Sequence, residues 1–432
     1  MTSIQYDTII VGAGFAGLIA ARELGLAGQS VLVLEAADRL GGRAYSSKLG
    51  NVPIELGGGY VYWSQPHIWS EITRYGLTLK ERPYYAATNA MAGTRFLING
   101  VLQDEFSQEE AAEIKSAFSE FLAPAKDVFP KPYHPFEAVK AKDFDKMSNK
   151  DRIDQLDISD LARAALLRTS AMQGNNSPYQ GGYIEALRWY ALSHFDDATY
   201  AASVSRFTLK EGSAYLLDKI AEESLAKKML NMPVDRVSQE DGTVTVSAQG
   251  QEFKASNVII ATGVNVWKSI EFSPKLSNEK QKLTQEELSG KGAKIYVSVK
   301  GRFKDSRWSA IGGPILSVLP HIVEEDQSTL VVFTNPEVSM EISKSKLQIE
   351  IARFDDSLEV LDFTYHDWVS DPFALGTWGN FRPNQFTRYF AQAVKAEGDI
   401  HFATADLAYG WRGFFDGAIE SGLRAARNVL ES

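Results

Sequence analysis

The chain has 432 residues, with 45 lysines and arginines against 55 aspartates and glutamates, so its formal net charge at pH 7 is −10. Hydrophobic residues make up 44% and charged residues 23%, which excludes disordered and fibrous classes and allows two domains with separate cores. An acidic chain without a basic block is a poor partner for nucleic acid or an anionic membrane surface. The absence of cysteine excludes disulfides, thiolate metal sites and cysteine nucleophiles.

The start of the chain carries no positive segment followed by an apolar one, so we expect no signal peptide. No run of 18 uncharged apolar residues occurs, which argues against a membrane-spanning helix. We therefore expect a cytoplasmic protein without a membrane partner. A metal is not expected either, because the histidines show no metal-ligand spacing: His67, His134, His194, His321, His366 and His401.

The first motif lies between a predicted strand at 6–11, which is β-branched and apolar, and a helical pattern at 18–24. It has the form Gly-x-Gly-x-x-Gly. The first glycine allows a tight turn, the second lets the backbone approach a pyrophosphate, and the third lets the helix pack on the strand. Free N–H groups and a partial positive charge at the helix start favour phosphates. We expect a dinucleotide to bind Gly12, Gly14, Phe15, Ala16 and Gly17.

A second predicted strand, 30–34, ends on Glu35, which stands 23 residues after Gly12. A carboxylate at this distance can accept hydrogen bonds from both hydroxyls of an adenosine ribose, and it would repel a 2′-phosphate. Ala36 follows it in the same predicted site. A turn that binds no phosphate is the alternative, since the chain has 33 glycines and such turns also arise by chance.

The next segment, Asp38-Arg39-Leu40-Gly41-Gly42-Arg43, resembles the extended fingerprint of the flavin amine oxidase family, which includes the monoamine oxidases. The resemblance implies FAD, with Arg39 and Arg43 reaching pyrophosphate oxygens and Gly42 keeping the loop close to them. The stretch at 54–60 is similar to the family segment that passes the flavin ring, where glycine lets the backbone lie against the isoalloxazine. It adds Leu56, Gly57, Gly58, Gly59 and Tyr60 to the expected FAD site.

The resemblance covers nearly the whole chain and implies an α/β fold with a discontinuous Rossmann-like FAD-binding domain of the glutathione-reductase type. A substrate domain with a mixed sheet and covering helices completes it. We expect helices near 108–125 and 158–172, a loop at 129–135, a β-meander opening at 233, and a return strand at 256–263. The predicted FAD domain comprises 1–85, 203–290 and 385–432, and the substrate domain 86–202 and 291–384.

The end of the chain completes the predicted FAD site. A strand at 400–404 precedes Asp406, where the family carries an acidic residue near the ribityl and pyrophosphate. The motif at 413–418 leads into a predicted helix at 419–430, whose N-terminus would face the flavin and stabilise the negative charge of reduction. The resemblance also places the backbone of Val234 at the adenine. The remaining expected FAD contacts are Asp406, Phe414, Phe415 and Ala418.

At the reacting face, Lys294 matches the family lysine that holds a water at flavin N5, with Lys291 as the competing candidate. Trp378 and Phe414 match the aromatic pair that flanks the amine in front of the flavin. The family pair is often two tyrosines, so this pair lacks hydroxyls and leaves a more apolar slot. Aromatic residues that could add to the pocket are Tyr60, Trp63, Tyr409 and Trp411.

The stretches around Trp63 and Trp378 look closest to bacterial nicotine and hydroxynicotine oxidoreductases. The resemblance implies an oxidoreductase that takes a hydride from a small aromatic or heteroaromatic amine onto flavin N5, giving an imine or iminium that hydrolyses. Its partners would be the amine and either oxygen or a protein electron acceptor, and a homodimer is an open alternative to a monomer. No side-chain constellation for other chemistry competes with the cofactor.

Two other functions stay open at this point. A flavin-free binding protein like the GDP-dissociation inhibitors has the same architecture, although Arg39, Gly42 and the glycines at 57–59 argue against it. An L-amino acid oxidase or a desaturase would keep the flavin. Amino acid oxidation would need an arginine facing the flavin to pair the carboxylate, and the candidates for that role are Arg188, Arg302 and Arg382.

The cofactor is predicted to be FAD held without a covalent bond; the chain has no cysteine to form a thioether link, and a link through histidine or tyrosine is the chemical alternative. The purified protein should be yellow, and acid or heat should release all of its flavin into the supernatant. Absorbance of the supernatant and of the denatured pellet measures this. Flavin that stays with the denatured chain would contradict the non-covalent attachment.

Overall fold

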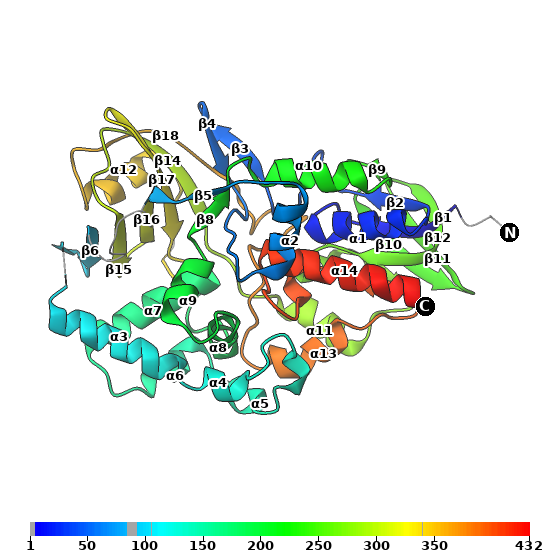
Figure 1. Ribbon diagram of the computed structural model, residues 1–432, viewed down its shortest axis with the longest axis horizontal. Helices are drawn as coiled ribbons and strands as arrows, with labels where there is room; N and C mark the ends of the chain where they lie inside the picture. The colour runs from blue at the N-terminus through cyan, green and yellow to red at the C-terminus, as the bar shows by residue number, and fades with distance from the viewer. Residues whose placement is uncertain (1–4, 84–92, 105, 339) are drawn as a thin grey trace.

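The computed structural model describes residues 5–83, 93–104, 106–338 and 340–432. Figure 1 shows an elongated molecule with one sheet at the end that carries both termini and a second sheet at the other end. A group of helices lies below the second sheet in this view, and the described strands form these two sheets and two small two-stranded pairs.

The first sheet has eight strands in the order β13-β10-β11-β12-β1-β2-β9, with β19 also paired to β12. Its centre is parallel, and apolar residues of β1 and β2 are buried on both faces, as expected for a covered parallel sheet. The strands are β1 (Tyr6–Val11), β2 (Val31–Leu34), β9 (Lys227–Met229), β10 (Val234–Glu240), β11 (Thr243–Ala248), β12 (Gln251–Ile260), β13 (Glu271–Ser273) and β19 (Ile400–Phe402).

The strand β12 changes partner along its length. Its first half pairs antiparallel with β11 and its second half pairs parallel with β1, and Ala255 opposes both Val244 and Tyr6. The sequence analysis treated the β-meander that opens at 233 and the return strand at 256–263 as separate elements. The structure joins them, because one continuous extended backbone can serve two ladders on opposite edges.

Two helices cover the parallel centre of the first sheet, α1 (Phe15–Leu26) and α14 (Phe415–Glu431), with α10 (Ser213–Glu223) beside α1. The α14 helix begins at Phe415, four residues before the predicted start. Its first turn contains Asp416, and an acidic side chain there is favourable next to the positive helix end. The helices α1 and α14 approach closely, because Gly422 faces the backbone of Ala16 without a Cβ between them.

The second sheet has seven strands in the order β18-β14-β17-β16-β15-β6-β7. All of them fall within 86–202 and 291–384, and all strands of the first sheet fall within 1–85, 203–290 and 385–432. We propose these ranges as the two domains. The strands are β6 (Thr94–Ile98), β7 (Val101–Gln103), β14 (Lys294–Lys300), β15 (Arg307–Ile311), β16 (Ile315–Val323), β17 (Gln327–Thr334) and β18 (Glu359–Tyr365).

The helical group contains the helices predicted near 108–125 and 158–172. Each has a serine as its N-cap residue, Ser107 for α3 and Ser159 for α7, and the serine side chain accepts a backbone N–H of the first turn. The α3 helix ends at Leu122, two residues before Pro124, which has no N–H to continue the helical hydrogen bonds. The group comprises α3 (Gln108–Leu122), α4 (Ala125–Val128), α5 (Ala141–Phe144), α6 (Asn149–Asp154), α7 (Asp160–Gly174), α8 (Tyr183–Leu192) and α9 (Asp197–Ser203).

Shorter elements connect these layers, and the hairpin of β3 and β4 packs Leu49 and Ile54 against Tyr296 and Val331 of the second sheet. They are β3 (Ser46–Leu49), β4 (Val52–Glu55), α2 (Pro66–Arg74), β5 (Leu79–Glu81), η2 (Pro135–Glu137), β8 (Phe207–Leu209), η3 (Val264–Ser269), α11 (Asn278–Glu286), α12 (Lys344–Ala352), η4 (Phe386–Phe390), α13 (Ala391–Ala393) and η5 (Ala405–Leu407).

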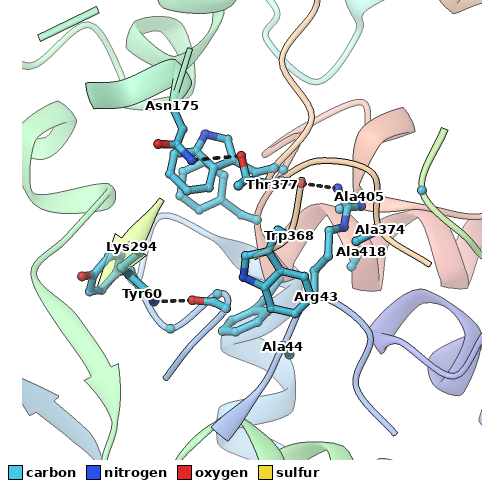
Figure 2. Close-up of a pocket in the computed structure, with 18 of the residues that line it drawn as sticks. Arg43, Ala44, Tyr60, Asn175, Lys294, Trp368, Ala374, Thr377, Ala405 and Ala418 are labelled. Atoms are coloured by element: carbon cyan, nitrogen blue, oxygen red, sulfur yellow. Dashed lines mark hydrogen bonds between the residues drawn. The ribbon is translucent and has the colours of Figure 1, made fainter. Parts of the chain in front are cut away.

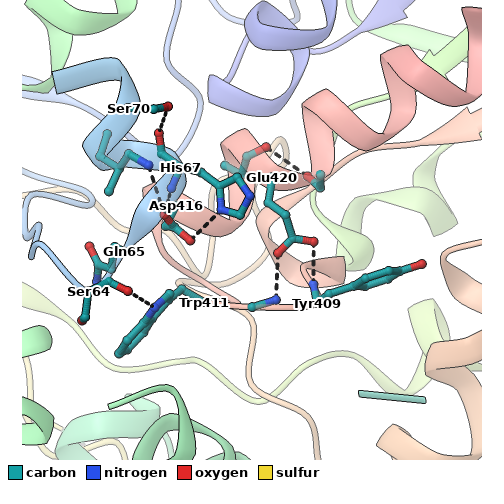
Figure 3. A network of polar contacts seen from close by, with 12 residues as sticks. Ser64, Gln65, His67, Ser70, Tyr409, Trp411, Asp416 and Glu420 are labelled. Atoms are coloured by element: carbon teal, nitrogen blue, oxygen red, sulfur yellow. Dashed lines mark hydrogen bonds and ion pairs between the residues drawn. The ribbon is translucent and has the colours of Figure 1, made fainter. Parts of the chain in front are cut away.

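Asp416 joins α14 to α2, as Figure 3 shows. The N-cap residue of α2, Gln65, makes no capping bond with its side chain, and Asp416 replaces it. Its carboxylate accepts the backbone N–H groups of His67 at 2.6 Å and Ile68 at 3.0 Å, and it faces His67 Nδ1 at 3.2 Å. Burial lowers the pKa of His67, but the bond to Asp416 outweighs burial and leaves this pKa raised.

The contact between α1 and α14 predicts that Gly422→Ala destabilises the fold. An added Cβ would lie 2.4 Å from the carbonyl oxygen of Ala16, so one helix has to shift. Overpacking of this kind costs about 1–3 kcal/mol of unfolding free energy. Urea unfolding followed by circular dichroism measures it. Arg427→Ala, at an exposed position of the same helix, is the control and should change the free energy by less than about 0.5 kcal/mol. Equal stability of the two variants would contradict the close approach.

Candidate functional site

A cavity of about 1220 Å³ is lined by residues of both sheets and of the helical group. It begins at the carboxyl ends of β1 and β2, where Val11 and Leu34 line it, and it extends to Lys294 and Phe333 of the second sheet. Ligands of open parallel sheets bind at this end of the strands. Its volume exceeds that of ordinary small-ligand pockets, about 300–1,000 Å³, so it can hold a cofactor and a substrate together.

The glycine turn opens the site at the start of α1. Gly12 has φ +106°, which favours glycine, and a Cβ there would lie 3.1 Å from the carbonyl oxygen of Ala261. The N-cap of α1, Gly14, makes no side-chain bond to the helix, and its first turn has no acidic residue. Phe15 and Ala16 line the cavity, so the free N–H groups of the helix start are available to phosphates.

Gly17 was predicted as a cofactor-binding residue, but it does not line the cavity. A Cβ on it would lie 2.0 Å from the carbonyl oxygen of Gly12, so only glycine lets α1 pack this closely on the turn. Gly17 therefore contributes to packing, as the sequence analysis expected of the third glycine, which lets the helix pack on the strand.

Glu35 ends β2 and lines the cavity with Ala36, although it is only 7% exposed. Its carboxylate accepts the backbone N–H groups of Ala13 at 2.7 Å and Ala37 at 2.8 Å. Burial raises the pKa of this carboxyl. Each carboxylate oxygen has two lone pairs, so each can still accept one more hydrogen bond, which fits a ribose diol.

Arg39 shapes the loop that it belongs to. Its guanidinium donates to the carbonyl oxygens of Leu40, Gly42 and Ala44 and covers the ring of Tyr45 at 3.8 Å. The group also lines the cavity, as does Gly42. Several of its donors are therefore bonded within the loop, and Arg39 stabilises the backbone at 40–44.

Arg43 lines the cavity and links distant parts of the chain, as Figure 2 shows. It donates to the carbonyl oxygen of Thr377 at 2.8 Å and to Asp406 Oδ1 at 2.8 Å. Asp406 does not line this cavity, and its second oxygen accepts the N–H of Val264 at 3.0 Å. Asp406 therefore lies behind Arg43 and holds that guanidinium at the cavity, and its expected contact with the ribityl chain stays a prediction.

The glycine-rich segment at 57–59 runs along the cavity next to Leu56 and Tyr60. A Cβ on Gly57 would lie 1.9 Å from the carbonyl oxygen of Arg43, and one on Gly58 would lie 2.8 Å from the ring of Phe415. The chain therefore needs glycine at 57 and 58 for packing, and the approach of a flat ring to this segment stays a prediction. Trp368, which the sequence analysis did not identify, lines the cavity and donates from Nε1 to the carbonyl oxygen of Leu56.

Lys294 lines the cavity, and its ammonium donates to the carbonyl oxygen of Gly57, as Figure 2 shows. Its Nζ lies 5.9 Å from the centre of the Tyr60 ring. Burial lowers the pKa of Lys294 to about 7, so its charge changes within the physiological range. The competing candidate, Lys291, pairs with Glu287 at 2.7 Å outside the cavity lining.

Trp378 and Phe414 line the same cavity from different loops. The indole Nε1 of Trp378 donates to the carbonyl oxygen of Gln173 at 2.9 Å. The ring of Phe414 packs edge-on against Trp189 and Trp411, with ring centres 5.2 and 5.3 Å apart. Both side chains therefore have fixed supports of their own, which suits a slot that positions a substrate.

Other predicted contacts divide into two groups. The cavity lining includes three further predicted residues, Val234, Phe415 and Ala418. It also includes residues that the sequence analysis missed, because only the fold brings them to the cavity: Met172, Gln173, Asn175, Trp189, Tyr200, Met232, Thr262, Thr377 and Thr404. Three aromatic candidates do not line it. Trp63 is 50% exposed, Trp411 is buried and donates to the carbonyl oxygen of Ser64, and Tyr409 is held through its backbone by Glu420.

None of the three arginines proposed to pair a substrate carboxylate lines the cavity. Arg188 is buried against Glu185 and the carbonyl oxygen of Tyr409. Arg302 pairs with Glu325 at 2.6 Å, and Arg382 donates to the carbonyl oxygen of Glu287. These positions give no support to amino acid oxidation through those residues.

The residues present fit an FAD. The helix start has free N–H groups, Glu35 has acceptor capacity for a ribose, and the segment at 57–59 lines the same large cavity as Lys294. Fold and site together define an FAD-dependent oxidoreductase.

The comparisons with known proteins identify the family. The sequence model described as Flavin containing amine oxidoreductase matches residues 15–430, and the chain belongs to this family. It is 34% identical over 438 residues to a pseudooxynicotine dehydrogenase of Pseudomonas sp, covering 99% of this chain and 87% of that protein. It is 30% identical to the (S)-6-hydroxynicotine oxidase of Paenarthrobacter nicotinovorans, and the match covers 99% of this chain and 100% of that protein. The structure of a putrescine oxidase double mutant is similar with a TM-score of 0.86, at 25% identity and 99% and 100% coverage.

The predicted fold class, the FAD cofactor and the small-molecule amine substrate are confirmed by this family membership. The flavin-free alternative like the GDP-dissociation inhibitors is therefore rejected. None of the described helices combines the length and the apolarity needed to cross a bilayer. Within the described ranges no cluster of three potential metal ligands occurs, and no metal is needed for the fit.

The position of Glu35 predicts that Glu35→Gln weakens FAD retention. The amide keeps the size but loses the charge that strengthens a bond to the ribose, which is worth about 1.5–3 kcal/mol. Titration of the stripped protein with FAD, followed by flavin fluorescence, should show a loss of about 10- to 100-fold in affinity. Glu240→Gln, at an exposed position of β10, is the matched control. Equal affinities of the two variants would mean that Glu35 is not the ribose ligand.

Proposed function

We propose that this enzyme oxidises the C–N bond of a small amine that carries an aromatic or heteroaromatic ring, as nicotine and its relatives do. The observation that carries this proposal is a single cavity in which Trp378 and Phe414 lie with Lys294 and the segment at 57–59. The names of two relatives, a pseudooxynicotine dehydrogenase and a hydroxynicotine oxidase, support the substrate class. The hydroxyl-free aromatic pair suits an apolar ring.

In the proposed reaction the neutral amine enters the slot between Trp378 and Phe414. When bound, FAD supplies the two-electron acceptor for the hydride that leaves the amine α-carbon. The two rings exclude water and align the C–H bond that breaks. The amine becomes an iminium, and water then adds to it and cleaves the C–N bond. No described side chain in the slot is proposed as a general base, because the amine binds already deprotonated.

The FAD contacts are proposed in the same way. The N–H groups at the start of α1 bind the pyrophosphate, Glu35 binds the ribose, and Val234 lies at the adenine. Phe415 and Ala418, in the first turn of α14, lie at the flavin end, where the positive helix end stabilises the charge of reduction. Attachment is proposed to be non-covalent.

Lys294 is proposed to act in reoxidation. The side chain of Lys294, beside Gly57, exchanges between the ammonium and the neutral amine near pH 7. It can hold a water, and as the ammonium it can stabilise negative charge that develops on an acceptor. The acceptor is either oxygen or a redox protein, and both words, dehydrogenase and oxidase, occur among the names of the relatives. A cytoplasmic location and a homodimer stay predictions.

The proposed division of labour predicts that Trp378→Ala slows flavin reduction and that Lys294→Met slows reoxidation. Loss of the indole misplaces the amine, and a misplacement of about 1 Å costs on the order of 100-fold in rate. Loss of the ammonium leaves the reductive step intact. Anaerobic stopped-flow mixing with nicotine or pseudooxynicotine measures reduction, and mixing of the reduced enzyme with air measures reoxidation.

Two matched variants serve as controls, Trp69→Ala at an exposed tryptophan of α2 and Lys291→Met at the lysine that pairs with Glu287. Both should behave as the wild type. If Trp378→Ala is reduced at the wild-type rate while Lys294→Met cannot be reduced, the assigned roles are wrong. If no ring-bearing amine reduces the wild-type flavin, the substrate class is wrong.

A further inference from the structure

Trp378 lies in a long connection between β18 and η4, which gives it no strand or helix of its own. A side chain on such a connection needs other contacts to keep one orientation. The described structure provides them from the last turn of α7. The indole N–H of Trp378 is bonded to the carbonyl oxygen of Gln173, two residues before Asn175, where the chain leaves the helix.

Asn175 is the C-cap of α7 and adopts the left-handed conformation with φ 47° and ψ 39°. Its carbonyl oxygen accepts the N–H groups of Lys291 at 2.7 Å and Gly292 at 2.9 Å. Its side-chain Nδ2 donates to the carbonyl oxygen of Gly292 at 2.9 Å and to Thr377 Oγ1 at 3.0 Å. Figure 2 shows the bond from Asn175 to Thr377, the residue that precedes Trp378.

A second layer of buried polar groups continues this contact. Asn176 donates to Ser289 Oγ at 2.7 Å and to Asn380 Oδ1 at 3.2 Å, and the backbone N–H and the hydroxyl of Ser289 both donate to the carbonyl oxygen of Asn380. Thr377, one residue before Trp378, and Asn380, two residues after it, are thus tied to the end of α7 and to 289–292. Every member of this amide cluster is at most 9% exposed: Asn175, Asn176, Ser289, Thr377 and Asn380.

The cluster leaves no space for an alternative packing. A Cβ on Gly292 would lie 2.1 Å from Asn175 Oδ1, and one on Gly290 would lie 2.4 Å from the carbonyl oxygen of Trp378. Buried amides and hydroxyls that lose a partner cannot turn to water, so each bond opposes any other loop arrangement. Packing and hydrogen bonding therefore hold the Trp378 loop in one place.

We propose that Asn175 is a positioning residue for amine oxidation: through Thr377, and together with the carbonyl oxygen of Gln173, it fixes the plane of the Trp378 ring that aligns the substrate. This inference rests on the proposed function. Asn175 acts through Trp378 and takes no part in proton or hydride transfer. Its removal leaves the FAD contacts at α1 and Glu35 untouched, because those lie on the first sheet.

The test uses Asn175→Gly in the full-length FAD enzyme. Glycine keeps the left-handed backbone and removes both side-chain bonds. We expect the limiting rate of anaerobic flavin reduction to fall on the order of 10- to 100-fold, with unchanged FAD retention and unchanged reoxidation in air. The matched control is Asn384→Gly, an exposed asparagine with φ 68°, which should keep the wild-type rates.

To distinguish positioning of the Trp378 ring from a merely structural role of Asn175, Asn175→Gly is repeated in a Trp378→Phe background. Phenylalanine has no N–H to bond Gln173, so a residue that acts through the indole plane should add less than about twofold there, as coupled neighbours do. The same fold loss in both backgrounds would overturn the proposal. If the amine reduces Asn175→Gly as fast as it reduces the wild-type enzyme, the proposal for Asn175 is also overturned. This outcome leaves the proposed function unaffected.

Thr377→Val gives a second route if Asn175→Gly does not fold. It removes the acceptor of the Asn175 bond and leaves the end of α7 unchanged. We expect the same direction of change in flavin reduction, again without loss of FAD. A wild-type reduction rate in Thr377→Val would overturn the role of the Asn175–Thr377 bond. Failure of every amine to reduce the wild type would instead defeat the proposed function.

Discussion

The ion pair of Arg43 with Asp406 holds together three parts of the chain that are far apart in sequence. One guanidinium donates to the carboxylate of Asp406 and to the backbone of Thr377, while the same carboxylate accepts the N–H of Val264. Asp406 is only 2% exposed, and removal of one partner would leave a buried charge unpaired. The junction therefore links the loop after the glycine fingerprint, the Trp378 loop and the segment before the C-terminal helix.

The part of the cavity around Lys294 and Trp378 is assembled from separate elements. Trp378 comes from a loop, Phe414 from the turn before α14, Lys294 from β14 and the segment at 57–59 from the loop after β4. Glycines allow these parts to meet without side chains between them, as at Gly57 against Arg43 and at Gly413, where a Cβ would lie 3.1 Å from Trp378 Cβ. The slot is therefore shaped by backbone approach as much as by aromatic rings.

Sequence reasoning succeeded where one short segment contains the whole physical signal. The turn at 12–17 and Glu35 belong to one strand–helix–strand unit, and their distances along the chain already imply their positions in space. It did not place Tyr409 and Trp411, which lie outside the cavity lining: the backbone N–H of Tyr409 donates to Glu420, and the indole of Trp411 donates to the carbonyl oxygen of Ser64. It also separated β12 into two strands, since the change of partner at Ala255 leaves no mark on the local pattern.

The sequence by itself determined the parallel FAD-binding unit and the class of cofactor, and it singled out Lys294, Trp378 and Phe414, which line one cavity, because glycine spacing, strand pattern and motif resemblance are local or family properties. Only the tertiary structure decided which of two lysines meets Gly57, which aromatics line the cavity and what supports Trp378. These outcomes depend on contacts such as Asn175 with Thr377, 202 residues apart in the chain. A buried polar group takes whichever partner the packed fold brings to it, and no local pattern encodes that partner.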